Sequence, residues 1–112
     1  MGVRAVALVL FLAALPASAA FAQRTTFEGL NSCQRYAAVE FGRRDPGFRR
    51  FIIERGSVVV EHFAGMVGNQ YVSTIYRGRA TYDAGIGSRT VRFICLHAGM
   101  GHGAVLVYAL PD

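Results

Sequence analysis

The spacing of apolar residues changes once along the chain, from a helical period to a strand-like one. Between residues 27 and 42 the apolar residues recur every three or four positions and form one stripe, made of Phe27, Leu30, Cys33, Tyr36, Ala37 and Phe41. This spacing predicts an amphipathic helix. Thr26 is suited to cap its N-terminus, and Gly42 with the Asp45-Pro46-Gly47 turn ends it.

From residue 48 onward the period becomes two, which is typical of β-strands. We predict five strands, over residues 48–54, 57–63, 70–82, 89–97 and 104–110. A tight turn at Arg55-Gly56 separates the first two, and the segments 65–69, 83–88 and 98–103 form the other loops and turns. Gly78 is the natural place for the long third strand to bend.

One helix followed by five mainly antiparallel strands predicts an α+β fold, with the helix packed on one face of a twisted sheet. Cys33 lies on the apolar stripe of the helix. Val91, Phe93, Cys95 and His97 share one face of the fourth strand, because side chains alternate along a strand. Both cysteines therefore face the same core, and we expect one small domain over residues 23–112.

Residues 1–22 have the layout of a secretory signal peptide. Arg4 precedes an uncharged apolar core from Ala5 to Leu15, Pro16 breaks the core, and two Ala-x-Ala sites follow. The core is shorter than the roughly 20 residues that cross a bilayer, and no later segment is apolar enough to do so. We therefore expect a periplasmic or secreted protein of the bacterial envelope that begins near Gln23.

Export determines how the two cysteines are interpreted. An even cysteine count in an exported chain predicts a disulfide, and Cys33 with Cys95 is the one possible pair. The bridge closes a loop of about 60 residues and contributes about 4 kcal/mol on the chain-entropy model. A sulfur in a disulfide is neither a nucleophile nor a thiolate ligand. A catalytic pair of Cys95 and His97 is therefore disfavoured.

Every basic residue is an arginine, and the net charge of the chain is +5. A positive balance favours anionic partners, which for an exported chain are envelope or extracellular proteins and anionic polymers rather than nucleic acid. Candidate binding residues are Arg77, Arg79 and Arg92 in the sheet, and Arg43 and Arg44 near the end of the helix. The alternatives are a solvated sheet face covered by arginine stems and stabilisation of the helix C-terminus.

The segment HAGMGHG, between the last two strands, holds a second candidate site. It contains His97, Met100 and His102, and the similar segment HFAGM contains His62 and Met66. Imidazole and thioether groups suit copper, and the thioether suits Cu(I) in particular. The alternative is structural, because a hairpin connection needs glycines with positive φ.

Patterns typical of enzymes do not occur in the sequence. The carboxylates are not paired by their spacing, and no serine lies in a nucleophile elbow. We expect a non-enzymatic protein without a cofactor, which recognises a partner or anionic ligand through a sheet face and an arginine-rich surface. Two alternatives stay open: a periplasmic copper-binding protein, and a small secreted inhibitor or enzyme with a site that the sequence does not reveal. The partner's identity and the oligomeric state also stay open.

Overall fold

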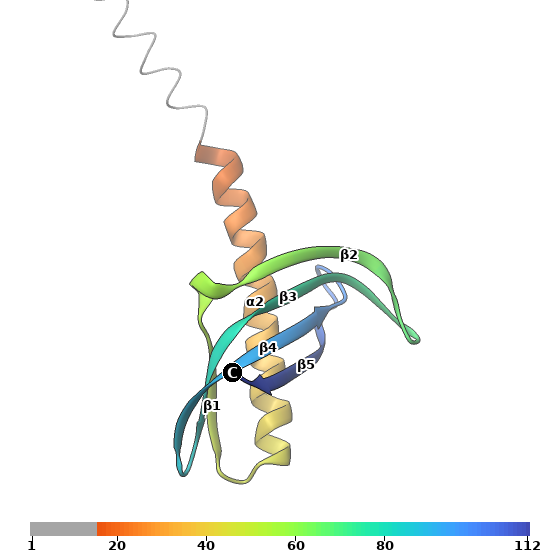
Figure 1. Ribbon diagram of the computed structural model, residues 1–112. Helices are drawn as coiled ribbons and strands as arrows, with labels where there is room; N and C mark the ends of the chain where they lie inside the picture. Colours follow the sequence, from red (N-terminus) through yellow and green to blue (C-terminus); the bar gives the residue numbers. More distant parts are fainter. Residues whose placement is uncertain (1–15) are drawn as a thin grey trace, which may run out of the picture.

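The computed structural model describes residues 16–112, with side chains from Glu28 onward. Helix α2 (Pro16–Arg44) comes first. It is followed by β1 (Phe48–Ile53), the 3₁₀ helix η1 (Arg55–Ser57), β2 (Val59–Val67), β3 (Gln70–Ala84), β4 (Gly87–His97) and β5 (Ala104–Pro111). Figure 1 shows helix α2 lying across the antiparallel sheet. The predicted α+β fold is confirmed.

Strand β3 is the centre of the sheet. On one side it pairs with β4 over residues 74–84, and β4 pairs in turn with β5. On its other side β3 pairs with two strands, because residues 80–84 face β1 and residues 70–77 face β2. Strands β1 and β2 therefore follow each other along a single edge of the sheet (Figure 1).

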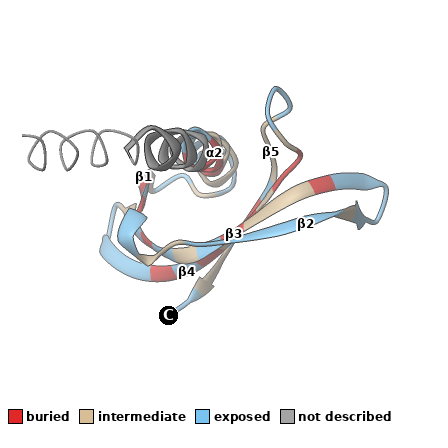
Figure 2. Cartoon of the chain, turned by 90° about the horizontal axis from the view of Figure 1, so that it is seen from above, coloured by how far each residue is buried: buried red, intermediate tan, exposed pale blue. Residues whose placement is uncertain are grey.

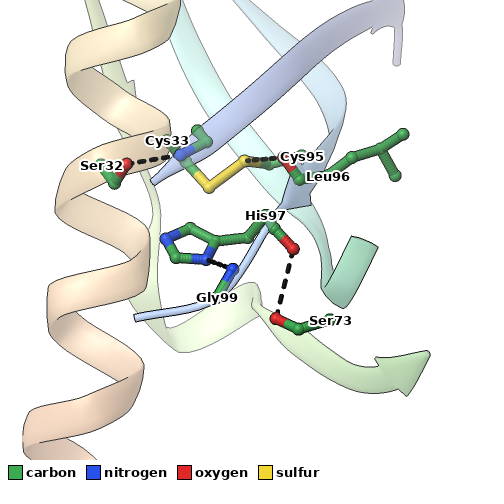
Figure 3. Close-up of a disulfide and its surroundings, with 8 residues drawn as sticks. Ser32, Cys33, Ser73, Cys95, Leu96, His97 and Gly99 are labelled. Carbon is green, nitrogen blue, oxygen red and sulfur yellow. Dashed lines mark hydrogen bonds between the residues drawn. A yellow bond between two sulfur atoms is a disulfide. The ribbon is translucent and has the colours of Figure 1, made fainter. Parts of the chain in front are cut away.

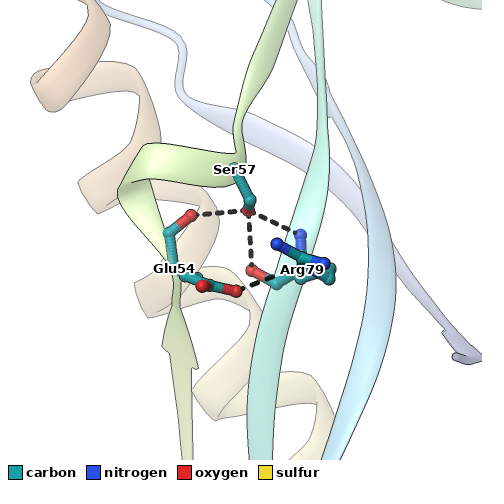
Figure 4. A network of polar contacts seen from close by, with 3 residues as sticks. All are labelled: Glu54, Ser57 and Arg79. Carbon is teal, nitrogen blue, oxygen red and sulfur yellow. Dashed lines mark hydrogen bonds and ion pairs between the residues drawn. The ribbon is translucent and has the colours of Figure 1, made fainter.

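The tight turn predicted at Arg55-Gly56 is wrong, because β1 and β2 pair with β3 and not with each other. Helix η1 connects them, and the hydroxyl of Ser57 holds it to β3. This hydroxyl donates to the carbonyl of Glu54 at 2.6 Å and accepts from the N–H of Arg79 at 2.9 Å (Figure 4). A Cβ at Gly78 would lie 2.9 Å from the Ser57 oxygen, so the glycine is required by this close approach.

Helix α2 begins earlier than predicted. Thr26 lies inside the helix and is not its N-cap. Residues 17–26 contain no proline or glycine that would interrupt a helix, and four of them are alanine, the residue with the highest helix propensity. Proline is also favoured in the first turn of a helix, where Pro16 lies. Of the predicted signal peptide, residues 1–15 lie outside the described part, so its removal stays a prediction. Within the described residues, no helix is long and apolar enough to cross a membrane.

Strand β2 extends through most of the segment 65–69 that the sequence predicts as a loop. Val67 pairs with Gln70, so the connection to β3 is the two-residue turn Gly68-Asn69. Gly68 has a φ of +60°, as the first central position of a type II′ turn requires. Similarly, β3 and β4 extend into the predicted turn 83–88 and leave residues 85 and 86 between them.

The core lies between helix α2 and one face of the sheet. In the part of the helix whose side chains are described, Leu30, Cys33 and Ala37 are the buried apolar residues. They face alternate residues of β3 and β4, and Figure 2 shows this alternation as separate buried positions along the strands. The buried residues of these two strands are Val72, Tyr76, Ala80, Tyr82, Val91, Phe93, Cys95 and His97. The faces predicted from the period of two are thus confirmed.

A disulfide joins Cys33 of helix α2 to Cys95 of β4, as predicted. The two Cα atoms are 6.0 Å apart, and both residues are fully buried (Figure 3). Disulfides persist in oxidising compartments. The covalent structure is therefore compatible with a protein outside the cytoplasm.

Candidate functional site

The sheet face opposite helix α2 carries the three arginines predicted for the sheet. They alternate with the buried residues of β3 and β4, so their side chains point away from the helix. Arg79 and Arg92 are direct cross-strand partners. A hollow of about 570 Å³ is lined by these arginines and by apolar residues of three strands, namely Arg77, Arg79, Arg92, Val59, Ile94 and Leu110.

Two of these arginines contact carboxylates of the same chain. Arg77 lies 3.4 Å from Glu61, and Arg79 lies 3.3 Å from Glu54 (Figure 4). Both pairs are about half exposed, and such pairs contribute about 0–1 kcal/mol to stability. Within residues 28–112, Arg92 has no ion-pair partner.

Apolar side chains continue this face on β5. Leu106 is 44% exposed and Tyr108 is 56% exposed. Their cross-strand partners on β4 are Leu96 and Ile94, which are half-buried. The arginines are therefore bordered by a strip of aliphatic and aromatic surface that the helix does not cover. We call this surface, with the arginine hollow, the open face.

Arg43 and Arg44 lie elsewhere, in the last turn of helix α2. Both guanidinium groups contact the carboxylate of Glu40, at 2.7 and 3.4 Å. Cations near the C-terminus of a helix interact favourably with its dipole. Their placement therefore fits the structural alternative, in which they stabilise the end of the helix.

The β4–β5 loop brings together three of the five residues considered as copper ligands. His97, Met100 and His102 line a hollow of about 340 Å³ between this loop and helix α2. His62 and Met66 lie on β2, opposite Thr74 and Tyr71, and do not line that hollow. Among the described residues, no group of three His, Cys, Asp or Glu side chains is arranged to hold a metal ion.

The surroundings of His97 determine what its imidazole can do. The residue is 4% exposed, and its ring packs edge-on against Tyr76 with the ring centres 5.9 Å apart. Its Nδ1 accepts a hydrogen bond from the N–H of Gly99 at 3.0 Å. Burial lowers the pKa of His97, which favours the neutral ring. Because Nδ1 is an acceptor, Nε2 carries the proton of that neutral ring.

Figure 3 shows the second ring nitrogen of His97 directed toward helix α2. In this tautomer the nitrogen presents a hydrogen-bond donor to the hollow and not a lone pair. A metal ion at Nε2 would require the proton to move to Nδ1, which would remove the acceptor for Gly99. This geometry argues against His97 as a copper ligand.

The helical side of this hollow is not evident from the sequence. Glu28, Ser32 and Arg35 line it from helix α2. The oxygen of Ser32 accepts a hydrogen bond from the N–H of Ala104 at 2.7 Å, which fixes the helix to the start of β5. No local pattern marks these residues, because the contact joins segments far apart in the chain.

The chain matches no protein-family model, and neither a curated protein nor a solved structure matches it significantly. Its function therefore has to be inferred from its own residues.

Proposed function

We propose that the protein is a non-enzymatic binding protein of the bacterial envelope, and that it recognises a protein partner with acidic side chains through the open face. The observation that carries this proposal is the group of Arg77, Arg79 and Arg92 around an apolar hollow on the uncovered side of the sheet. The disulfide and the predicted signal peptide support the location.

The arrangement of charge favours an acidic group. Like charges directly opposite each other on neighbouring strands destabilise a sheet, and Arg79 and Arg92 are such a pair. A carboxylate that binds between them replaces repulsion with attraction. Guanidinium groups bind carboxylates through two parallel hydrogen bonds, and Arg92 has no carboxylate partner within the described residues.

The apolar part of the open face favours a protein as the partner. Protein interfaces are enriched in Tyr and Arg, and these residues dominate the binding energy of many complexes. Tyr108 and Leu106 lie beside the arginine hollow with about half of their surface exposed. A partner segment that alternates acidic and apolar side chains matches both parts. The net charge of the chain, +5, becomes +4 when Arg4 is removed with the predicted signal peptide, and this positive charge would accelerate the partner's approach.

The test compares two double variants with the same loss of charge. Arg79→Gln/Arg92→Gln changes the open face, and Arg43→Gln/Arg44→Gln changes the end of helix α2. Each protein is used for cross-linking capture from an envelope extract, and a captured protein is then purified and its Kd measured directly. We expect binding by the wild type and the helix variant, at least tenfold weaker binding by the open-face variant, and weaker binding at high salt. Identical capture by all three proteins would contradict the proposal.

A further inference from the structure

The hollow between helix α2 and the β4–β5 loop has the features of a second binding site, separate from the open face. Its volume of about 340 Å³ lies in the range of small-molecule sites, about 300–1,000 Å³. Glycines at 99, 101 and 103 give the loop its shape, with φ values of +112°, +85° and +82°. Other residues rarely adopt these conformations, so the loop conformation that forms the hollow depends on glycine.

The side-chain donor of an otherwise buried residue lines this hollow. His97 is 4% exposed and lines it, and its Nε2–H has no hydrogen-bond partner within the described residues. Among the described residues no fully buried side-chain nitrogen or oxygen lacks a partner, so this nitrogen is reached by solvent from the hollow, although the rest of the residue is buried. An unpartnered donor at a hollow is therefore a position where a ligand acceptor would be stabilised.

Helix α2 supplies two further donors. The oxygen of Ser32 accepts the bond from Ala104, which leaves the hydroxyl hydrogen available to a ligand. Arg35 lies one turn further along the same side of the helix and also lines the hollow. Its side chain is exposed, and it has no ion-pair partner among residues 28–112. The one carboxylate in the lining is that of Glu28, which is exposed.

We propose that this hollow binds a small oxyanion, a carboxylate or a phosphate, through the guanidinium of Arg35, the Nε2–H of His97 and the hydroxyl of Ser32. These three donors come from helix α2 and β4 and line the same hollow, and hydrogen bonds from a charged donor such as guanidinium to an oxyanion are the strong ones. The donor form of His97 separates this site from a copper site, which would use a lone pair on the same nitrogen.

The experiment uses the ¹⁵N-labelled protein and two probes, inorganic phosphate and acetate. Titration is followed through the ring nitrogens of His97 and the amide signals of residues 99–103. We expect saturable shifts of both sets of signals while Nε2 keeps its proton. The probe that binds more tightly identifies the oxyanion class.

Three single variants locate the binding. Arg35→Gln should weaken it about tenfold, because a charged hydrogen bond is lost, and Glu28→Gln should strengthen it by removing a repulsive charge. Arg49→Gln is the matched control, since Arg49 is an exposed arginine outside this hollow, and it should leave the affinity unchanged. Arg79→Gln/Arg92→Gln should also leave the affinity for the probe unchanged. The proposals for this site and for the open face are therefore tested independently.

Three results would overturn the proposal. The first is the absence of saturable shifts with either probe. The second is an equal weakening by Arg35→Gln and Arg49→Gln, which would indicate an adventitious ion only. The third is tight binding of Cu(I) or Cu(II) with loss of the Nε2 proton, which would make the hollow a metal site. The dispersion of the amide spectrum shows for each variant that the fold is intact.

Discussion

Arg79 and Arg92 lie directly opposite each other on β3 and β4, so two positive side chains are adjacent on the open face. Because such a pair is repulsive, we expect Arg92→Thr to raise the free energy of unfolding by about 0.2–1 kcal/mol. Urea denaturation at low and high salt measures this change, and the gain should shrink as salt screens the repulsion.

Arg77→Thr is the control for this prediction. The cross-strand partner of Arg77 on β4 is Ile94, so its removal relieves no repulsion. Its loss instead removes the ion pair with Glu61. A loss of stability in Arg92→Thr at every salt concentration would mean that the stem of Arg92 stabilises the sheet by packing.

The disulfide accounts for a large part of the expected stability. Cys33 and Cys95 are 62 positions apart, and on the chain-entropy model a loop of this size contributes about 4 kcal/mol. We expect the reduced protein, compared with the oxidised protein by urea denaturation, to lose a free energy of this order. Equal midpoints before and after reduction would show that helix α2 stays docked without the covalent link.

The hydroxyl of Tyr82 donates a hydrogen bond of 2.6 Å to Asp45. Burial and this bond raise the pKa of Tyr82 to about 12. The same bond, together with a second one donated by the N–H of Gly47, lowers the pKa of Asp45. The contribution of Tyr82 is therefore complete below pH 10 and is lost as the pH rises toward about 12. Asp45 stabilises above its ordinary pKa of 3.8 and loses that effect as the pH falls below it.

Tyr82→Phe should lower the free energy of unfolding near neutral pH and remove this part of the alkaline loss. Tyrosinate absorbance, followed with pH, reports the titration itself. Tyr108→Phe is the control, because Tyr108 is 56% exposed. If the highest tyrosine pKa persists in Tyr82→Phe, the pairing of Tyr82 with Asp45 is not its cause.

Gly29 of helix α2 lies against the hydroxyl of Tyr76. A Cβ at this position would overlap that oxygen. We expect Gly29→Ala to destabilise the protein. Overpacking costs about 1–3 kcal/mol of stability, whereas the higher helix propensity of alanine stabilises by only about 1 kcal/mol. Thermal denaturation measures the difference.

Removal of the hydroxyl tests the cause of this effect. In a Tyr76→Phe background the cost of Gly29→Ala should fall, and a double-mutant cycle measures the coupling. Gly56→Ala is the matched glycine control, since nothing lies within 4 Å of its added carbon. An equal cost of Gly29→Ala in both backgrounds would exclude the contact with Tyr76 as the reason.

The sequence predicts the local periods and the faces well. The stripe that contains Cys33 and the alternation around Cys95 both point to the core, and the bridge between them confirms this. The start of helix α2 is missed because Thr26 has the properties of a cap while the preceding residues also favour a helix.

Non-local pairing is what the sequence does not reveal. Arg55-Gly56 resembles a turn, but the chain continues along the same edge because β3 is long enough to pair with both β1 and β2. The site around His97 is partly predicted through the loop residues. Ser32 and Arg35 join it only through the packing of the helix on the loop, and no spacing in the sequence records that contact.

The packing of helix α2 has a consequence for how the chain acquires its structure. Helix α2 precedes every strand and packs against β1, which follows it directly, and against β4 and β5, which come last of the five strands. Its contacts with β4 and β5, and oxidation of the link to Cys95, must wait until those strands have been synthesised. We therefore expect this layer of the fold to close late, after synthesis of β5, which would suit a chain that is exported before it folds.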